Sequence, residues 1–189
     1  MGRWEPNARG RLERAAIELF EERGFDQTTA AEIAARAGLT ERTFFRHFAD
    51  KREVLFGGVL QLQERFVAAV AGAPAARGPI EAVADGLREI AAMLGDNREF
   101  ATVRQSIIAA NPELQERELI KLATLAGAVG EALRGRGVPD PAASLSAEAG
   151  IAAFKVGFAR WVEPANSRGL GELIAESLDQ LRLVTAGGS

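Results

Sequence analysis

Apolar residues recur with helical spacing along almost the whole chain. The first clear stripe is Leu12, Ala16, Leu19 and Phe20, whose spacing of i, i+4, i+7 and i+8 places them on one face of a helix. Runs that alternate apolar and polar positions between turn residues, as a half-buried strand would, are missing. The pattern therefore predicts an all-α fold.

Helix boundaries are well marked near the amino terminus. A first helix is predicted from near Pro6 to Arg23, because Gly24 follows it as a C-terminal glycine should. Thr29 and Glu32 have the spacing of a capping box, which begins a second helix, and Gly38 closes that helix.

Two more helices follow at once. Thr40 is placed to cap a third helix over about Glu41–His47. Asp50 with Glu53 marks the start of a fourth, predicted to run unbroken to Ala71 and so to contain Gly57-Gly58. Each glycine inside a helix costs about 1 kcal/mol relative to alanine. Either close packing against another helix or a compliant point in the chain would explain the pair.

The rest of the chain carries five more apolar stripes, separated by Pro and Gly breakers. They predict helices over 80–94, 100–108, 112–133, 151–162 and 170–181. The total is about nine helices. We expect a small amino-terminal DNA-binding bundle over residues 1–56 and a larger effector-binding and dimerisation bundle over 57–189.

Composition excludes several classes of function. The 189 residues contain no cysteine and one histidine, so disulfides, thiolate sites and an ordinary zinc site are not expected. Paired acids, a phosphate loop and a glutamate–histidine helix motif are also missing, so we expect no enzyme, no catalytic residues, no cofactor and no metal. No apolar run approaches the length of a membrane span, which predicts a soluble, cytoplasmic protein without a membrane partner.

Charge points to one local patch. The net charge of −3 argues against a protein that coats nucleic acid by bulk charge. Between residues 36 and 52, however, five cations face only Glu41 and Asp50. The five are Arg36, Arg42, Arg46, Lys51 and Arg52. Such a patch is either a solvated helix surface or the footprint of a nucleic-acid contact.

The segment from Thr29 to Phe48 favours the second explanation. It predicts a helix, a tight glycine turn and a second helix, the unit that places its second helix in the major groove of DNA. Phe44 and Phe48 are four residues apart and are predicted to face the bundle core. The side chains left outward are Glu41, Arg42, Thr43, Phe45, Arg46 and His47.

These residues also carry a family resemblance. The stretch LERAAIELFEERGFDQTTAAEIAARAGLTERTFFRHFADKREVLF closely resembles the DNA-binding domain of TetR family regulators. The resemblance implies a homodimer that binds a palindromic double-stranded DNA operator, with repression as the default action. It also implies that the carboxy-terminal bundle binds a small effector.

The resemblance assigns roles residue by residue. Positions that usually hold backbone phosphates are occupied by Thr29, Thr40, Thr43, His47 and Lys51, and positions that read bases by Glu41, Arg42 and Arg46. Phe45 stands where a tyrosine often bonds a phosphate, so that contact is lost or replaced by packing on a sugar or a thymine methyl group. Arg42 stands where many members have glycine. It could reach a guanine, or instead contact a phosphate or pair with Glu41.

The last two stripes suggest a partner and a ligand. Their apolar residues predict pairing of two copies through the last two helices. Arg104 and Lys155 lie at apolar positions of their stripes, so both are predicted to point inward or to graze the core. Such a cation needs a path along which its side chain reaches water, an acid such as Glu99, Glu118 or Glu148, or an anionic amphipathic effector. The apolar body of that effector would lie among Met93, Phe100, Phe154, Phe158 and Trp161.

One other class of function remains open at this point. A helical ligand-binding or interaction module without sequence-specific DNA binding would also explain the apolar stripes. It would leave the outward Thr43, Arg46 and His47 without a purpose. Steep salt dependence of duplex DNA binding separates the two classes.

Overall fold

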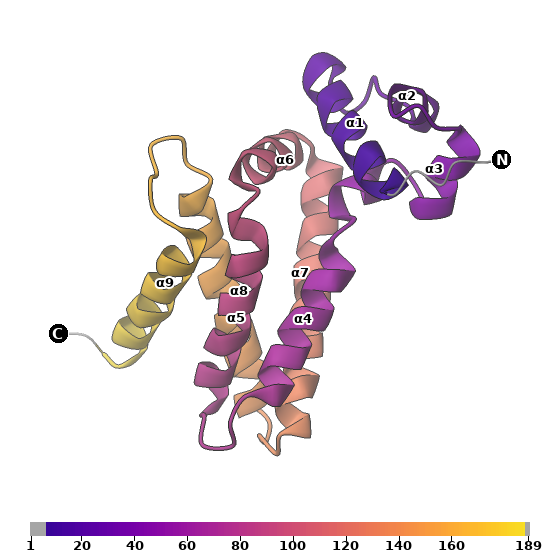
Figure 1. The fold of residues 1–189 in the computed structure, drawn as a ribbon. Coiled ribbons are helices and arrows are strands. Elements are labelled where there is room, and N and C mark those ends of the chain that lie inside the picture. Colours follow the sequence, from indigo (N-terminus) through magenta and orange to yellow (C-terminus); the bar gives the residue numbers. More distant parts are fainter. Residues whose placement is uncertain (1–6, 188–189) are drawn as a thin grey trace. The chain divides into compact units, whose positions relative to one another are not determined.

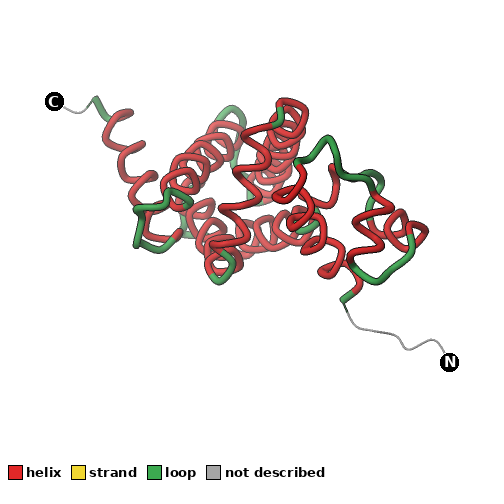
Figure 2. The backbone as a smooth tube through the Cα atoms, turned by 90° about the horizontal axis from the view of Figure 1, so that it is seen from above, coloured by secondary structure: helices red, strands yellow, loops and turns green. Residues whose placement is uncertain are grey.

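The computed structural model describes residues 7–187, and every regular element within that range is a helix (Figure 2). The prediction of an all-α fold with nine helices is confirmed, and one short 3-10 helix, η1, is added. In chain order the elements are α1 (Ala8–Arg23), α2 (Ala30–Arg36), α3 (Glu41–His47), η1 (Arg52–Phe56), α4 (Val59–Gly72), α5 (Pro79–Gly95), α6 (Arg98–Ala110), α7 (Pro112–Gly135), α8 (Ala142–Trp161) and α9 (Leu170–Thr185).

The chain divides into two compact units. The first consists of the chain up to Gly58 together with Val103–Glu116, and the second consists of Val59–Thr102 and the chain from Arg117 onward. Helix α6 therefore gives its first residues to the second unit and the others to the first. The sequence predicted a DNA-binding bundle over residues 1–56 and an effector-binding and dimerisation bundle over 57–189. That assignment of functions stays a prediction.

The caps expected in the first unit are present. Glu32 N–H donates to Thr29 Oγ1 at 3.2 Å, and Thr29 N–H donates to Glu32 Oε2 at 2.9 Å, which completes the capping box of α2. Gly24 and Gly38 have positive φ angles of 85° and 67°, as the ends of α1 and α2 require. The start expected for the first helix near Pro6 lies outside the described residues.

The prediction of an unbroken fourth helix is wrong. The chain forms η1, turns at Gly57-Gly58 and only then begins α4. Arg9 on α1 donates a hydrogen bond to Gly57 O, and a β-carbon at Gly57 would collide with the Glu13 carboxylate. A β-carbon at Gly58 would meet nothing. Close packing therefore explains Gly57, while a compliant point at Gly58 stays a prediction.

This same stretch qualifies the expectation about membrane spans. Among the described residues, Arg52–Gly72 is long and apolar enough to cross a membrane, with a mean hydropathy of 1.3. The turn at Gly57-Gly58 interrupts it, and Phe66 and Val70 are buried in the core of the second unit. Burial of one face is typical of a core helix, so the segment is weak evidence for a membrane location.

The second unit is a bundle built around α5 and α8. Helix α5 packs against α4, α8 and α9, and α8 packs against α9 (Figure 1). The stripe Leu170, Leu173, Ile174 and Leu178 is buried within the chain, at 2–5% exposure. These four side chains therefore close the bundle within the chain, while pairing of two copies through the last two helices stays a prediction.

Two arginines bind loop backbone in the second unit. The Arg136 guanidinium donates to the carbonyl oxygens of Ala71, Ala73, Pro74 and Arg77, which fixes the connection between α4 and α5. Arg98 donates from Nε to Trp161 O at 2.9 Å and from Nη2 to Glu163 O at 2.7 Å, so it satisfies carbonyls at the end of α8.

The closest approach of α8 and α9 gives a stability prediction. A β-carbon at Gly157 would lie 2.9 Å from Ile174 N and 3.0 Å from Ile174 Cα, both backbone atoms that cannot move alone. Gly157→Ala should lower the free energy of unfolding, since overpacking costs about 1–3 kcal/mol and helix propensity returns only about 1 kcal/mol.

Gly127→Ala on α7 is the matched control, because its β-carbon would meet nothing within 4 Å. That variant should be more stable than the parent by up to about 1 kcal/mol. Denaturant unfolding followed by circular dichroism measures both. Equal stability of the two variants would contradict the close approach of α8 and α9.

Candidate DNA-binding surface and effector groove

Two buried phenylalanines hold α3 on the first unit. Phe44 and Phe48 are 0% and 3% exposed, with ring centroids 5.5 Å apart, which confirms that they face the core. Phe45 is 52% exposed and its ring meets Phe44 edge-on at 5.4 Å. With one face fixed in this way, the opposite face of α3 is available to a partner.

The first turn of α3 presents hydroxyl groups. Thr40 Oγ1 accepts a hydrogen bond from Thr43 N–H at 3.2 Å and lies 3.0 Å from the Thr43 hydroxyl. The amino end of a helix also carries partial positive charge. The hydroxyl of Thr29, at the start of α2, is exposed but bonded to Glu32 Oε2 at 2.9 Å. Thr29 and Thr40 cap helices and Thr43 lies in the first turn of α3, so three hydroxyl groups gather at the starts of these two helices.

The structure divides the basic patch into paired and unpaired cations. Arg36 pairs with Glu22 at 2.7 Å and Glu18 at 3.3 Å, and its hydrogen bond lowers the pKa of the Glu22 carboxyl. Arg52 pairs with Asp50 at 2.7 Å. The charges of these two guanidinium groups are therefore balanced by carboxylates of the same chain.

Arg42 and Arg46 form the unpaired part. Both are exposed on α3, and within the described range neither makes an ion pair or hydrogen bond. The alternative in which Arg42 pairs with Glu41 is therefore not what the free protein adopts. These two guanidinium groups share the short helix with one exposed acid, Glu41, so they leave α3 with a net positive charge.

Lys51 is placed differently from the expectation of a free phosphate contact. Its ammonium group donates to Phe25 O at 2.8 Å, Thr28 O at 3.2 Å and Asp26 O at 3.4 Å, and it lies 4.2 Å from the centroid of the Phe25 ring. The cation is thus bound by backbone of its own chain.

His47 is half-buried at the end of α3. Its Nε2 atom is buried, with no hydrogen-bond partner among the described residues. Burial lowers the pKa of the imidazole, and the charges of Arg46 and Arg9 lower it further. These effects favour the neutral form of the imidazole. A phosphate contact from it would have to come through Nδ1.

Three of the aromatic residues expected to bind an effector, Phe154, Phe158 and Trp161, form a row on α8 in the second unit. The ring centroids of Phe154 and Phe158 are 5.6 Å apart, and those of Phe158 and Trp161 are 5.7 Å apart. Met93 and Phe100 are 38% and 39% exposed. A ligand-binding role for these residues stays a proposal.

The two cations expected beside that effector do not point into the aromatic row. Lys155 is exposed, so the prediction that it faces inward is wrong, because the helix turns it toward solvent one position away from the buried stripe. Arg104 donates from Nε to Leu55 O at 2.7 Å, and its guanidinium lies 5.1 Å from the centroid of the Phe56 ring, all within the first unit.

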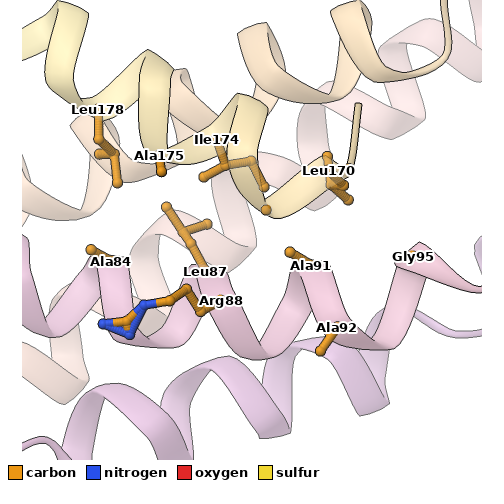
Figure 3. A pocket seen from close by; sticks show the side chains of 12 residues that line it. Ala84, Leu87, Arg88, Ala91, Ala92, Gly95, Leu170, Ile174, Ala175 and Leu178 are labelled. Atoms are coloured by element: carbon orange, nitrogen blue, oxygen red, sulfur yellow. The ribbon is translucent and has the colours of Figure 1, made fainter. Parts of the chain in front are cut away.

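The second unit contains a groove that the sequence did not reveal. It has a volume of about 480 Å³ and lies between α5 and α9, with Leu87 and Ile174 projecting into it and Arg88 at its side (Figure 3). The predicted effector residues are not part of its lining. Small residues at helical spacing on both helices, such as Ala84, Ala91, Gly95, Gly171 and Ala175, are the signal that could have indicated it. Within the part of the chain that is described, no three acidic or histidine side chains gather as metal ligands would.

Comparison with known families matches both parts of the chain. Residues 13–56 match the family described as bacterial regulatory proteins, tetR family, and residues 77–186 match the MftR C-terminal domain of the same family. The first match contains the whole of α2 and α3. The second contains the bundle from α5 to α9.

Individual relatives agree. The HTH-type transcriptional regulator TcmR of Streptomyces glaucescens is 36% identical over 109 residues, which are 58% of this chain and 48% of TcmR. The chain thus spans about half the length of this curated relative. Among solved structures, Thermus thermophilus FadR in complex with lauroyl-CoA is 28% identical, with a TM-score of 0.54 over 94% of this chain and 93% of that one.

A third relative extends the likeness in fold. SmeT is a repressor from Stenotrophomonas maltophilia. The structure of its complex with triclosan has a TM-score of 0.66 at 21% identity, over 94% of this chain and 90% of that one. The first family model covers α2, α3 and the turn between them, and the second spans 110 of the 189 residues. On this evidence the chain belongs to the TetR family of bacterial regulatory proteins.

Proposed function

We propose that the chain is a cytoplasmic transcriptional regulator that binds a palindromic DNA operator as a homodimer, represses transcription and is released by a small-molecule effector. One observation carries the proposal. Helix α3 is anchored by Phe44 on one face and presents Arg42 and Arg46 without partners on the other. Unpaired guanidinium groups on an anchored helix suit the major groove, where base edges and phosphates supply acceptors.

Contacts of two kinds follow from this arrangement. Arg42 can donate two parallel hydrogen bonds to guanine O6 and N7, and the exposed ring of Phe45 can pack on a thymine methyl group. Thr40, Thr43 and His47 surround them and would bind backbone phosphates. The first kind selects the sequence and the second positions the helix.

A homodimer is supported by apolar residues that the second unit leaves uncovered. Leu145, Ala152 and Val156 lie on one face of α8, where Leu145 is 65% and Val156 54% exposed. Leu183 and Val184 on α9 are 57% and 71% exposed. Burying these side chains against a second copy would remove them from water and relate two copies of α3 by a two-fold axis.

The other candidate function is a helical interaction module that does not read DNA. The same exposed apolar faces of α8 and α9 favour it. In such a module Arg42 and Arg46 would be hydrated surface cations without a binding role.

Selection of duplexes from a random library by the full chain tests the proposed function. We expect an inverted repeat whose half-sites lie about 34–36 Å apart or a multiple of that distance. Affinity for the selected duplex should fall steeply with salt, because phosphate contacts release counterions. Salt-independent or absent binding would favour the interaction module.

Arg42→Ala should relax the preference at one base pair of each half-site and cost about 1–3 kcal/mol there. Arg65→Ala, which removes an exposed cation from α4, is the matched control and should leave the selected sequence unchanged. An unchanged base preference in Arg42→Ala would contradict its base-reading role.

For the effector we propose an amphipathic molecule with an acyl chain, bound in the groove between α5 and α9. FadR, 28% identical, is described in complex with lauroyl-CoA. The groove is apolar along Leu87, Ile174 and Leu178, and Arg88 supplies a cation at its side. Its volume of about 480 Å³ falls in the range of small-molecule sites.

Thermal denaturation with laurate and with a neutral alcohol of equal length tests this effector. A ligand that binds only the folded chain raises the midpoint, and laurate should raise it more than the alcohol does. Ala175→Trp fills the groove from an exposed position and should abolish the shift. Loss of the shift in Phe158→Ala but not in Ala175→Trp would move the site to the aromatic row.

As the pH falls, titration of His47 should change folding stability and DNA affinity in opposite directions. Its folded-state pKa is lowered by burial, then by Arg46 and Arg9, so the unfolded chain takes up a proton first as pH falls. The stability contributed by His47 is therefore fully present above about pH 6.5 and is lost as pH falls below that value. A nearby phosphate favours the protonated imidazole, so affinity for DNA should rise over the same range.

Melting temperature and DNA affinity at pH 7.5 and 5.5 measure the two effects. His47→Gln cannot titrate and should show less acid destabilisation and less gain in affinity than the parent. Identical pH profiles for parent and variant would show that the imidazole plays neither part.

A further inference from the structure

We propose that an amphipathic anion lies lengthwise in the groove between α5 and α9, with its head group beside Arg88 and its chain running toward Gly95 and Gly169. This direction, which rests on the effector site proposed above, makes the groove selective for chains of about its own length.

The two helices that form the groove run in opposite directions. Ala91 on α5 lies opposite Gly171 on α9, where a β-carbon at Gly171 would be 3.6 Å from that of Ala91. About three turns earlier on α5, Glu81 lies 3.5 Å from Arg182, which is about three turns later on α9. The groove therefore has two distinct ends, one toward the start of α5 and one toward its end.

The end toward the start of α5 is closed by charged side chains. Ala84 and Leu178 are the last lining residues there (Figure 3). Beyond them, Arg182 bridges to Glu81 and also pairs with Asp179 at 2.9 Å. One cation is shared by two carboxylates, and these repel a further anion. Neither the head group nor the chain of an anionic amphiphile fits past this end.

The opposite end is bounded by glycine. Gly95 is the last residue of α5 and Gly169 precedes the first turn of α9, and both line the groove. A β-carbon at Gly95 would meet nothing within 4 Å. Because no side chain stands in the way, the far end of a long chain can project into solvent here.

Arg88 supplies the polar group of the groove. Among the described residues that line it, Arg88 is the one with a charged side chain. Its side chain lies along α5 toward Ala84, and its guanidinium pairs with Asp85 (Figure 3). The other oxygen of the Asp85 carboxylate lies 3.4 Å from Arg77 Nε. Two cations thus share one carboxylate, and an anionic head group would balance the remaining positive charge.

The length and floor of the groove suit one extended chain. Leu87, Leu170 and Ile174 are 1–3% exposed and form an apolar floor. Ala84 and Gly95 are eleven residues apart on α5, a distance of about 16 Å. An extended chain of carbon–carbon bonds of about 1.5 Å advances about 1.25 Å per bond, so about 12 bonds fill the groove.

A series of saturated fatty acids from octanoate to palmitate tests this direction. Affinities are measured by isothermal titration calorimetry with the full chain, below the micelle concentration of each acid. Affinity should rise about fourfold per added methylene group, the factor that corresponds to about 0.8 kcal/mol. The rise should stop once the chain has about 12 bonds, because later carbons project past Gly95.

Gly95→Leu places a side chain across the open end of the groove. It should leave octanoate affinity as in the parent and lower myristate affinity several-fold, because only the longer chain reaches that end. Gly127→Leu on α7 is the matched control, since a β-carbon there would meet nothing within 4 Å and Gly127 is not part of the lining. This control should keep the parent's series.

Arg88→Gln tests the head group. It should lower laurate affinity by about three- to fivefold, as expected for an exposed ion pair, and leave the affinity of the neutral dodecanol unchanged. Arg65→Gln, which removes an exposed cation from α4, is the control and should change neither affinity.

Equal losses for octanoate and myristate in Gly95→Leu would put the head group at that end and overturn the direction. A series in Gly95→Leu identical to that of the parent would place the ligand outside the groove. An unchanged preference for laurate over dodecanol in Arg88→Gln would overturn the head-group site. A parent chain that binds none of the acids would overturn the proposed effector class and this direction with it, while selection of a duplex by the same protein would show that the DNA-binding function stands.

Discussion

Burial of Phe44 is the constraint on which the proposed DNA-binding surface depends. Helix α3 has seven residues, too few for a helix to be stable in water without tertiary contacts. Packing supplies the missing stability through Phe44, which is 0% exposed, and through Phe48 beside it. The outward direction of Arg42, Phe45 and Arg46 is a consequence, because a helix fixed by one face has no freedom to turn the other.

The cations of the first unit's basic patch fall into two groups, those bound by other groups of the chain and those left to solvent. Arg36, Lys51 and Arg52 are held by carboxylates or carbonyls of the chain, and Arg42 and Arg46 are not. A tally of basic residues along the sequence treats all five alike. The structure separates them, and only the second group brings uncompensated charge to a ligand. An acidic protein can therefore present a cationic face without a high overall charge.

Local signals were enough to predict the helices, the caps of α2 and α3 and the inward direction of Phe44, because each depends on residues within one or two turns. Features that depend on distant contacts could not be predicted. Lys51 meets carbonyls some 25 positions away, and Arg104 meets Leu55 O 49 positions away. Periodicity placed Lys155 in the apolar stripe, yet one residue on α8 is a rotation of about 100°, which puts it in solvent.

The contacts of Arg136 change what the connection between α4 and α5 can do. Its sequence, Gly72-Ala-Pro74-Ala-Ala-Arg77-Gly78, has the small residues typical of exposed loops that proteases cut. Cleavage requires the backbone to leave the surface and extend through an active site. Here three carbonyls of the connection, and that of Ala71 in the last turn of α4, are bound by one guanidinium, so the loop cannot extend without losing these hydrogen bonds. The loop would resist proteolysis although its composition suggests the opposite.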